Sequence, residues 1–394
     1  MLNIMKGIAL LGIFILQVIG PFSGWLDFLS PEQKAALPTA AADSLWGTAA
    51  GILLTEKCLG IFSFLIGITF YYQMQKAERQ ESQYNHQFLK RLAILFVAGL
   101  VHAYLLSSAD VLRNYAFCGL FLLVVYKWPA KRIFIQGVIF LLVLPAVFMF
   151  LSSSFPAGEI GSREMQEIRN GFMGITYLDL IKSNIIMDMH LQSQVFLRLQ
   201  DLSVMLGQFL LGFWAGKRNV FSRLDAIQHK FVWVFWLCLS VVALKSGFAY
   251  FISQVGVSNA LFQVVQAADK AFALLATQAM TGCYVCGITL VLKNQAFRKA
   301  LLWLSPVGRM SLSVYLLQSI IGAYVFYGVG LGYFGKTGPA ISIPVAVLLF
   351  GCQVLFSHYW LARFKFGPFE WLTRFAINWA PKEKSLASPV KVVS

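Results

Sequence analysis

Long apolar runs separated by short polar connections make up almost the whole chain. A transmembrane helix needs about 20 predominantly apolar residues, whereas the strands of a membrane barrel alternate over about 10 residues. The runs here are continuous and close to the helical length, so they predict an all-α, polytopic transmembrane bundle that forms a single integral membrane domain over 1–394. We expect ten spans, at residues 7–27, 46–74, 91–108, 110–127, 133–151, 200–217, 229–252, 269–292, 306–329 and 339–362.

Two stretches fall outside this pattern. Residues 152–199 form the one long connection, and they mix polar residues with Phe172, Tyr177 and Ile181, which is typical of short amphipathic helices. Residues 363–394 follow the last apolar run and predict a C-terminal tail.

Lysine and arginine gather in alternate connections, and this placement predicts the orientation of the chain. Cytoplasmic loops of membrane proteins carry an excess of these residues. They cluster here at 76–91, 127–132, 217–230, 293–299 and 363–391. We therefore expect both termini in the cytoplasm, with 363–394 as a cytoplasmic tail and 152–199 as an extracytoplasmic loop. The third span then runs outward and carries His102 about 17 Å from its cytoplasmic start.

The composition supports this assignment and changes how the net charge is interpreted. The 394 residues are 58% hydrophobic and 12% charged, whereas soluble domains carry roughly 25% charged residues. A net charge of +15 would suggest nucleic-acid binding in a soluble protein, but here the charges lie between the apolar runs. We expect the lipid bilayer as a partner and no nucleic acid.

All six cysteines lie within apolar segments. Cys283 and Cys286 are spaced as C-x-x-C, but no second ligand pair accompanies them. We expect them to pack as small apolar residues, without a bound metal ion.

A candidate site lies in the hairpin formed by the third and fourth runs. The stretch RLAILFVAGLVHAYLL, residues 91–106, carries His102 well inside its length, and Asp110 and Arg113 follow at the tip. Ionisable side chains are costly in hydrocarbon, so they usually face protein partners or a polar cavity. Three interpretations of His102 remain open: a hydrogen bond to a neighbouring helix, a proton relay in a transporter, or a general base. Asp110 can orient His102 or pair with Arg113.

The second span places Glu56, Gly60, Ser63 and Gly67 at offsets of one helix face, with Lys57 beside them. The small residues favour close helix packing. The adjacent Glu56 and Lys57 must be paired or hydrated, either as a structural ion pair or within a polar cavity.

The ninth span repeats such a stripe. It consists of Gly308, Ser311, Tyr315, Gln318 and Gly322, flanked by Arg309 and Ser319. Hydrogen bonds between helices explain each polar residue taken singly, whereas the stripe as a whole favours a lined cavity. No Ser-His-Asp array and no nucleotide-binding fingerprint is visible in the sequence.

Five motifs carry a resemblance to a known family. They are KGIALLGIFILQ at 6–17, KCLGIFSFLIG at 57–67, the hairpin with GLVHAYLLSSADVLRNYAFCG within 91–119, GRMSLSVYLLQS at 308–319 and FGPFEWLTR at 366–374. Together they resemble the DUF418 (YeiB-like) family of bacterial multi-pass membrane proteins. Lys6 and Asn3 stand where that family usually has Arg and Asp, and Leu59 stands in place of Phe.

The resemblance implies an enzyme of the bacterial inner membrane. The family is similar to a wider group of membrane acyltransferases, which includes acyltransferase-3 proteins and heparan glucosaminide acetyltransferase. The implied reaction moves an acyl group, acetyl as the first choice, from acyl-CoA to a hydroxyl or amine of a small-molecule or cell-envelope acceptor. Acyl-CoA would be a co-substrate, with no permanently bound cofactor.

The resemblance also suggests a role for each candidate residue. His102 would be the general base and Asp110 would orient it, while Arg113, Lys57 or Arg309 would stabilise negative charge or hold the donor phosphates. Lys6 would join Arg309 at these phosphates. The other residues assigned to substrate or acyl-donor binding are Glu56, Ser63, Ser311, Tyr315, Gln318 and Ser319.

A second hypothesis comes from a different class of protein. A transporter or exporter of a small amphiphilic molecule would use Glu56, Lys57, His102 and Asp110 as a proton or substrate path. Transporters are often built from inverted repeats, and no convincing internal repeat is present. Either class is compatible with a homo-oligomer.

Overall fold

The computed structural model describes the chain except for residues 79–83, 156–157, 159, 255–258 and 379–394. All regular elements in the described part are helices, which confirms the predicted all-α class. The α-helices are α1 (Leu2–Gln17), α2 (Pro31–Ala35), α3 (Ala40–Leu54), α4 (Lys57–Glu78), α5 (Tyr84–Leu105), α6 (Leu112–Val125), α7 (Ala130–Val138), α8 (Leu144–Ser154), α9 (Ser162–Met173), α10 (Tyr177–Ser193), α11 (Val195–Lys217), α12 (Leu224–Gln254), α13 (Asn259–Lys293), α14 (Gln295–Ala300), α15 (Ser305–Arg309), α16 (Ser311–Phe326), α17 (Pro339–Arg363) and α18 (Pro368–Asn378). Short π or 3-10 turns are η1 (Val18–Phe22), η2 (Ile139–Val143), η3 (Val220–Arg223) and η4 (Leu302–Leu304).

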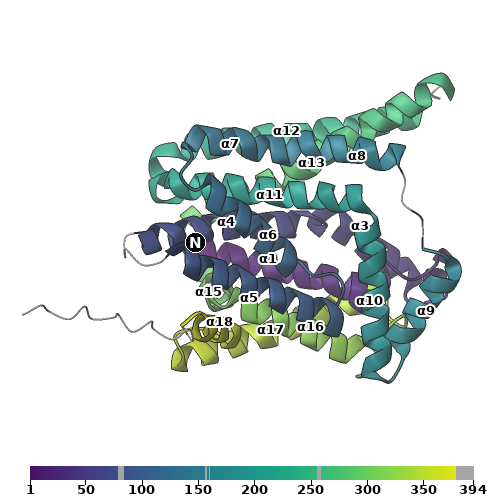
Figure 1. The fold of residues 1–394 in the computed structure, drawn as a ribbon. Coiled ribbons are helices and arrows are strands. Elements are labelled where there is room, and N and C mark those ends of the chain that lie inside the picture. Colours follow the sequence, from purple (N-terminus) through teal and green to yellow (C-terminus); the bar gives the residue numbers. More distant parts are fainter. Residues whose placement is uncertain (79–83, 156–157, 159, 255–258, 379–394) are drawn as a thin grey trace, which may run out of the picture.

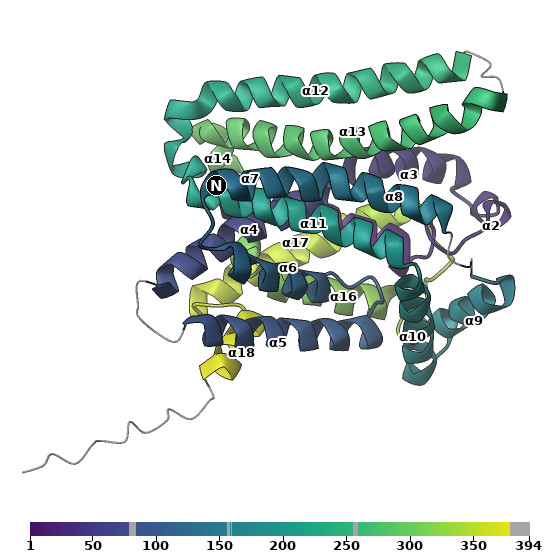
Figure 2. The ribbon, with the colours of Figure 1, turned by 45° about the horizontal axis from the view of Figure 1, so that its top comes forward.

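The long helices run side by side along one common direction (Figures 1 and 2). The N-terminus and α18 lie at one end of the bundle, which we call the inner end because the basic connections predict it to face the cytoplasm. Helix α9 lies at the opposite, outer end, and α10 crosses that end at a steep angle to the long helices.

Helix α1 lies at the centre of the bundle and contacts α4, α15, α16 and α17. Its approach to α15 is close because Gly7 and Gly308 carry no side chain: a Cβ on Gly7 would collide with the Leu304 carbonyl, and one on Gly308 with the Asn3 carbonyl. This packing surrounds α1 with protein, which explains why its sequence is apolar on every face.

Helix α12 lies at the edge of the bundle and pairs with α13. No residue in the apolar window of Val220–Ile252 is buried, although Trp233, Trp236 and Leu237 are among its side chains. Exposed apolar surface of this extent needs an apolar surrounding. The chain is therefore a multi-pass membrane protein with a lipid-facing α12.

Each of the ten predicted spans coincides with an apolar helix or helix pair. Eight helical segments of the described chain are long and apolar enough to cross a membrane, and a bent pair, Leu302–Arg309 with Ser311–Phe326, would be a ninth. The remaining span corresponds to α6, which is apolar but has only 14 residues.

Two breaks change the predicted helix faces. The second span is interrupted between α3 and α4, where Glu56 has a φ of +63°. The expectation that Glu56 shares one helix face with Gly60, Ser63 and Gly67 is therefore wrong. The ninth span bends by 86° between α15 and α16, so Gly308 does not continue the stripe that begins at Ser311.

The two stretches outside the apolar pattern also contain helices. The connection 152–199 holds α9 and α10, and α10 packs against α5. The beginning of the predicted tail forms α18, which contacts α5 and α16. Lys382, Lys384 and Lys391 lie outside the described residues.

Candidate active site

His102 lies between the predicted partner Asp110 and a serine from a distant helix. Its Nε2 lies 2.7 Å from Ser319 Oγ, and its Nδ1 lies 3.1 Å from Asp110 Oδ1, a contact that is bent rather than linear. His102 is 1% exposed, Ser319 0% and Asp110 7%. The sequence did not reveal a Ser-His-Asp array, and the structure corrects this: helices α5 and α16 bring one together from residues 217 positions apart.

The backbone fold at the hairpin tip fixes the Asp110 carboxylate. Its Oδ1 accepts a hydrogen bond from the Leu112 N–H at 3.1 Å, and its Oδ2 accepts one from the Arg113 N–H at 2.9 Å. Arg113 Nε also approaches Oδ2, at 3.3 Å. Asp110 therefore contacts both partners that the sequence suggested, one with each oxygen.

Arg113 connects the hairpin to α10. Its Nη1 and Nη2 donate to the two oxygens of Asp188 at 3.0 and 2.7 Å. Burial opposes ionisation of Asp188, but the hydrogen bonds and charge of Arg113 outweigh it and lower the pKa of that carboxyl. Arg113 does not contact His102 and does not line the cavity described below. Its place is that of a positioning residue.

Asn184 holds the same helix against the hairpin. Its Oδ1 accepts from the Ser108 N–H at 3.1 Å, and its Nδ2 donates to the Tyr104 carbonyl at 3.2 Å. Asn184 and Asp188 are four residues apart and so share one face of α10. We did not predict either residue. The available signal was this polar pair on an otherwise apolar face of an amphipathic segment.

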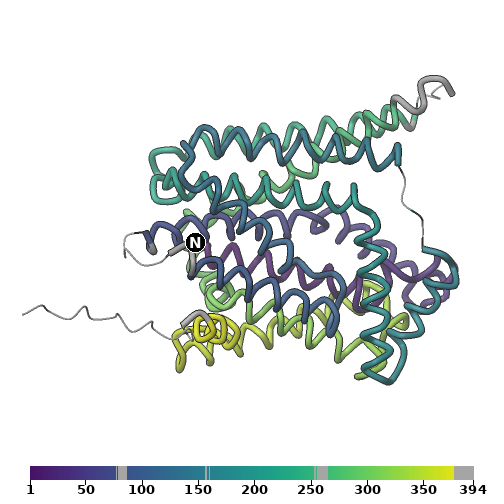
Figure 3. Tube along the Cα trace, in the orientation of Figure 1, coloured from purple at the N-terminus to yellow at the C-terminus, as the bar shows by residue number. Residues whose placement is uncertain are grey.

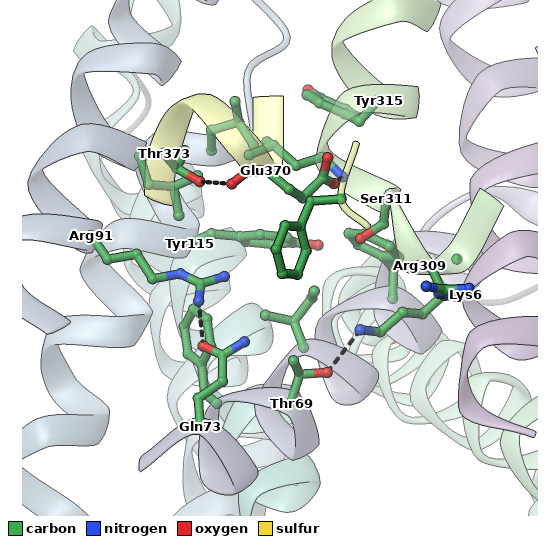
Figure 4. Close-up of a pocket in the computed structure, with 18 of the residues that line it drawn as sticks. Lys6, Thr69, Gln73, Arg91, Tyr115, Arg309, Ser311, Tyr315, Glu370 and Thr373 are labelled. Carbon is green, nitrogen blue, oxygen red and sulfur yellow. Dashed lines mark hydrogen bonds between the residues drawn. The ribbon is translucent and has the colours of Figure 1, made fainter. Parts of the chain in front are cut away.

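A cavity of about 380 Å³ opens among α1, α4, α5, α6, α15, α16 and α18 (Figure 4). Its cationic lining residues are Lys6, Arg91, Arg309, Lys365 and Arg374. Figure 4 shows Arg91 on one side and Lys6 with Arg309 on the other. Lys6 Nζ donates to Thr69 Oγ1 at 2.8 Å, and Arg91 Nη1 donates to Gln73 Oε1 at 2.7 Å. Five cations around one cavity form an anion-binding environment.

Glu370 is the only acid among the described lining residues, and both of its carboxylate oxygens accept hydrogen bonds from other residues of the chain. Its Oε1 accepts from the N–H groups of Leu312 and Ser313 at 2.9 and 3.2 Å, at the start of α16. Its other oxygen accepts from the Ser313 hydroxyl. Glu370 therefore caps α16 and fixes the wall that carries Ser311 and Tyr315. The motif that contains it supported the family resemblance, but nothing in the sequence indicated its partner helix.

Aromatic side chains also line the cavity, close to the buried group of Asp110, His102 and Ser319, which we call the relay. Tyr115 and Phe62 stack with ring centroids 6.1 Å apart, and Ser63 is within 3.2 Å of the Tyr115 hydroxyl. The ring of Tyr315 lies 5.2 Å from that of His102, and Tyr315 also lines the cavity. Tyr315 therefore lies between the cavity and the Asp110–His102–Ser319 relay.

Several predicted residues lie elsewhere. Glu56 and Lys57 lie at the α3–α4 break and are not among the cavity residues. Gln318 is buried and donates to the Leu10 carbonyl at 3.3 Å, so it joins α16 to α1 rather than lining the cavity. Among the predicted donor-binding residues, Lys6, Arg309, Ser311 and Tyr315 do line the cavity.

Helices α4 and α11 pack through glycines of the second-span stripe. A side chain on Gly67 would collide with the Phe209 backbone, and one on Gly60 with the Gln208 side chain. This agrees with the expected packing role of both glycines.

The chain is similar to several bacterial proteins. Residues 215–380 match the model of DUF418, described as a protein of unknown function. The chain is 27% identical to the uncharacterized protein YxaH of Bacillus subtilis (strain 168), over 97% of this chain and 95% of that protein. It is 24% identical to the uncharacterized 39.9 kDa protein in the amylase 3′ region of Bacillus acidopullulyticus, over 95% of this chain and 92% of that protein. No solved structure matches the chain.

A third similar protein matches a shorter stretch of the chain at a higher sequence identity. Over 76 residues, or 19% of each chain, the protein is 40% identical to the uncharacterized protein YeiB of Escherichia coli (strain K12). The family match at 215–380 takes in α16 with Tyr315 and Ser319 as well as α18 with Glu370. These matches relate the chain to the DUF418 (YeiB-like) proteins, with the family model covering residues 215–380.

Proposed function

We propose that this protein is a membrane-embedded acyltransferase. It takes an acyl group from cytoplasmic acyl-CoA and transfers it to a hydroxyl or amine of a small-molecule or cell-envelope acceptor. The observation that carries the proposal is one arrangement: five cations and Tyr315 line the same cavity, and the Tyr315 ring lies 5.2 Å from the ring of His102 in the buried Asp110–His102–Ser319 relay. We place the enzyme in the bacterial inner membrane, with the cavity facing the cytoplasm.

The cations match the charged part of the donor. Coenzyme A carries a diphosphate and a 3′-phosphate, and guanidinium groups bind phosphate oxygens through paired, charge-assisted hydrogen bonds. Arg309, Lys365 and Arg374 are exposed and so can reach a ligand, with the Arg374 guanidinium also stacked on the Phe366 ring at 3.9 Å. The cavity volume suits the narrow pantetheine arm, and the nucleotide then lies near these cations.

The relay supplies the proton transfer that the reaction requires. A hydroxyl or amine must lose a proton as it attacks a thioester, and a positioned imidazole can take it. Asp110 Oδ1 lies 3.1 Å from Nδ1 on one side of the ring, and Nε2 faces Ser319 and α16 on the other. Because all three groups are buried, water has little access to a thioester bound there.

Binding of coenzyme A tests the donor site. We expect Arg309→Gln and Arg374→Gln each to raise the Kd of acetyl-CoA for the purified protein about tenfold, since one charge-assisted hydrogen bond is removed. The control is Lys230→Gln, which removes an exposed cation on α12 outside the cavity. Equal Kd values for all four proteins, or no binding, would argue against the proposal.

The same preparation separates an enzyme from a transporter. In proteoliposomes, we expect free CoA thiol to be released in step with acceptor acylation. Uptake of an amphiphile with no acyl donor present, together with no CoA release, would favour the transporter class instead.

A further inference from the structure

The relay geometry has a feature that a simple general base does not need. The catalytic nitrogen of His102 does not face open space: Nε2 is occupied by the Ser319 hydroxyl at 2.7 Å. The opposite nitrogen faces the Asp110 carboxylate at 3.1 Å. A nucleophile hydrogen-bonded to a base, with the base oriented by a carboxylate, is the arrangement that activates a serine hydroxyl for covalent catalysis.

The position of Ser319 along α16 fits this role. Ser311 and Tyr315 line the cavity, and Ser319 lies one turn beyond Tyr315 on the same helix face. A thioester that reaches Tyr315 from the inner end is therefore one helical turn from the Ser319 hydroxyl. For direct transfer, donor and acceptor would both have to reach a histidine that is 1% exposed at the same time.

We infer that Ser319 is a covalent acyl carrier, an inference that rests on the proposed acyltransferase function. In the first half-reaction, Ser319 Oγ attacks the thioester carbonyl and its proton passes to His102 Nε2. The C–S bond breaks, and His102 returns the proton to the leaving thiolate, which gives free CoA and an acyl-serine ester. No electrons are exchanged with an outside oxidant or reductant.

The second half-reaction reverses the proton flow. The acceptor hydroxyl or amine gives its proton to His102 Nε2 as it attacks the ester carbonyl. The bond between the carbonyl carbon and Ser319 Oγ breaks, and His102 returns the proton to Oγ. Asp110 keeps the ring oriented during both steps.

The Tyr315 side chain offers a hydrogen-bond donor for the negatively charged oxygen that forms during the reaction. The Tyr315 hydroxyl is buried beside the Val111 backbone, and it makes no hydrogen bond of standard geometry with the described residues. A buried donor without an acceptor is costly, so such a group gains a partner when a negatively charged oxygen forms nearby. The structure assigns Tyr315 the role of stabilising the tetrahedral intermediate.

Covalent labelling tests the carrier. Purified protein is incubated with [14C]acetyl-CoA and no acceptor, then analysed by intact mass and by mapping of the α16 peptide. We expect one acetyl group per chain on Ser319, cleaved by alkaline hydroxylamine as expected for an oxyester. Ser319→Ala should remove the label and lower transfer about 100-fold or more, whereas Ser319→Cys should keep a label in the form of a more labile thioester.

The control is Ser203→Ala, which removes another buried serine hydroxyl whose hydrogen bond, to the Gln200 carbonyl at 2.8 Å, stays within its own helix. It should label like the wild type, and thermal unfolding checks that each variant is folded. Acyl transfer by Ser319→Ala at the wild-type rate, or a label on His102, would contradict the role of Ser319 as acyl carrier. Neither result would contradict the acyltransferase proposal itself. A wild-type protein that binds no acyl-CoA and transfers nothing would overturn both.

Discussion

At the scale of single residues, the candidate site is built around one imidazole with a polar side chain beside each of its nitrogens. Asp110 and Ser319 lie on opposite sides of His102, and two backbone N–H groups fix the Asp110 carboxylate. His102, Asp110 and Arg113 were predictable because ionisable groups are rare in apolar runs. Ser319 was assigned only a binding role, because a serine in a transmembrane helix is ordinary and its partner lies on a helix 217 residues away.

Asp110→Asn tests the orienting role directly. An amide keeps the size of the side chain but loses the negative charge that holds the imidazole and faces Arg113. We expect acyl transfer to fall about 1000-fold or more, by analogy with other histidine–carboxylate pairs. The measurement is the transfer rate at saturating acetyl-CoA, with the Kd of acetyl-CoA as the control, since Asp110 does not line the cavity. A normal transfer rate would remove Asp110 from the relay.

At the scale of elements, helix breaks and crossing helices decide which residues meet. The bend between α15 and α16 starts a new helix at Ser311, and Glu370 from α18 caps it. Periodicity alone treats 306–329 as one straight helix and so joins Gly308 and Gln318 to a single stripe. The prediction of one unbroken helix over the second span is wrong for the same reason, because that span breaks at Glu56. A hydropathy pattern detects a span but not a break within it, because the few charged residues at the breaks, Glu56, Lys57 and Arg309, are averaged with long apolar runs on either side.

Helix α10 closes the outer end of the hairpin, and its attachment depends on Asp188. The native pKa of this carboxyl lies below its ordinary value, so the ion pair with Arg113 stabilises the fold above the unfolded pKa and is lost only as the pH falls through the lowered one. The protection factors of the α10 amides, which correct for the pH dependence of intrinsic exchange, should therefore be equal at about pH 8 and about pH 5.5.

Asp188→Asn removes this charge and should speed exchange in α10 at both of these pH values. Asp179→Asn, at the start of the same helix, is the matched control, because its carboxylate contacts the nearby Thr176 rather than the hairpin. Unchanged exchange in Asp188→Asn would show that Asn184 and apolar packing hold α10 alone.

At the scale of the whole molecule, the amino-acid pattern predicts the architecture well. Ten apolar runs become a bundle of long parallel and antiparallel helices, whose path can be followed along the trace in Figure 3. Apolar length is a direct requirement of the bilayer, so it can be recognised without any knowledge of packing. The cavity could not be predicted in this way, because its lining comes from seven helices spread from Asn3 to Arg374.

The orientation of the bundle can be checked by labelling from outside the cell. We expect Ser162→Cys, on the outer α9, to react with a membrane-impermeant maleimide in intact cells. Arg223→Cys, before α12 at the inner end, should react only after the membrane is opened. Both positions are exposed, and the native cysteines lie in apolar segments, which keeps the background low. The opposite labelling pattern would invert the bundle and turn the cavity toward the outside.

The central claim is that the cavity delivers an acyl thioester to the relay. A cryo-EM map of the protein with a non-hydrolysable acyl-CoA analogue tests it most directly. The account predicts phosphate density against Arg309, Lys365 and Arg374, with the acyl carbon at Tyr315 and within reach of Ser319 and His102. An unfilled cavity at saturating analogue, or an analogue bound with its acyl end away from His102, would contradict it.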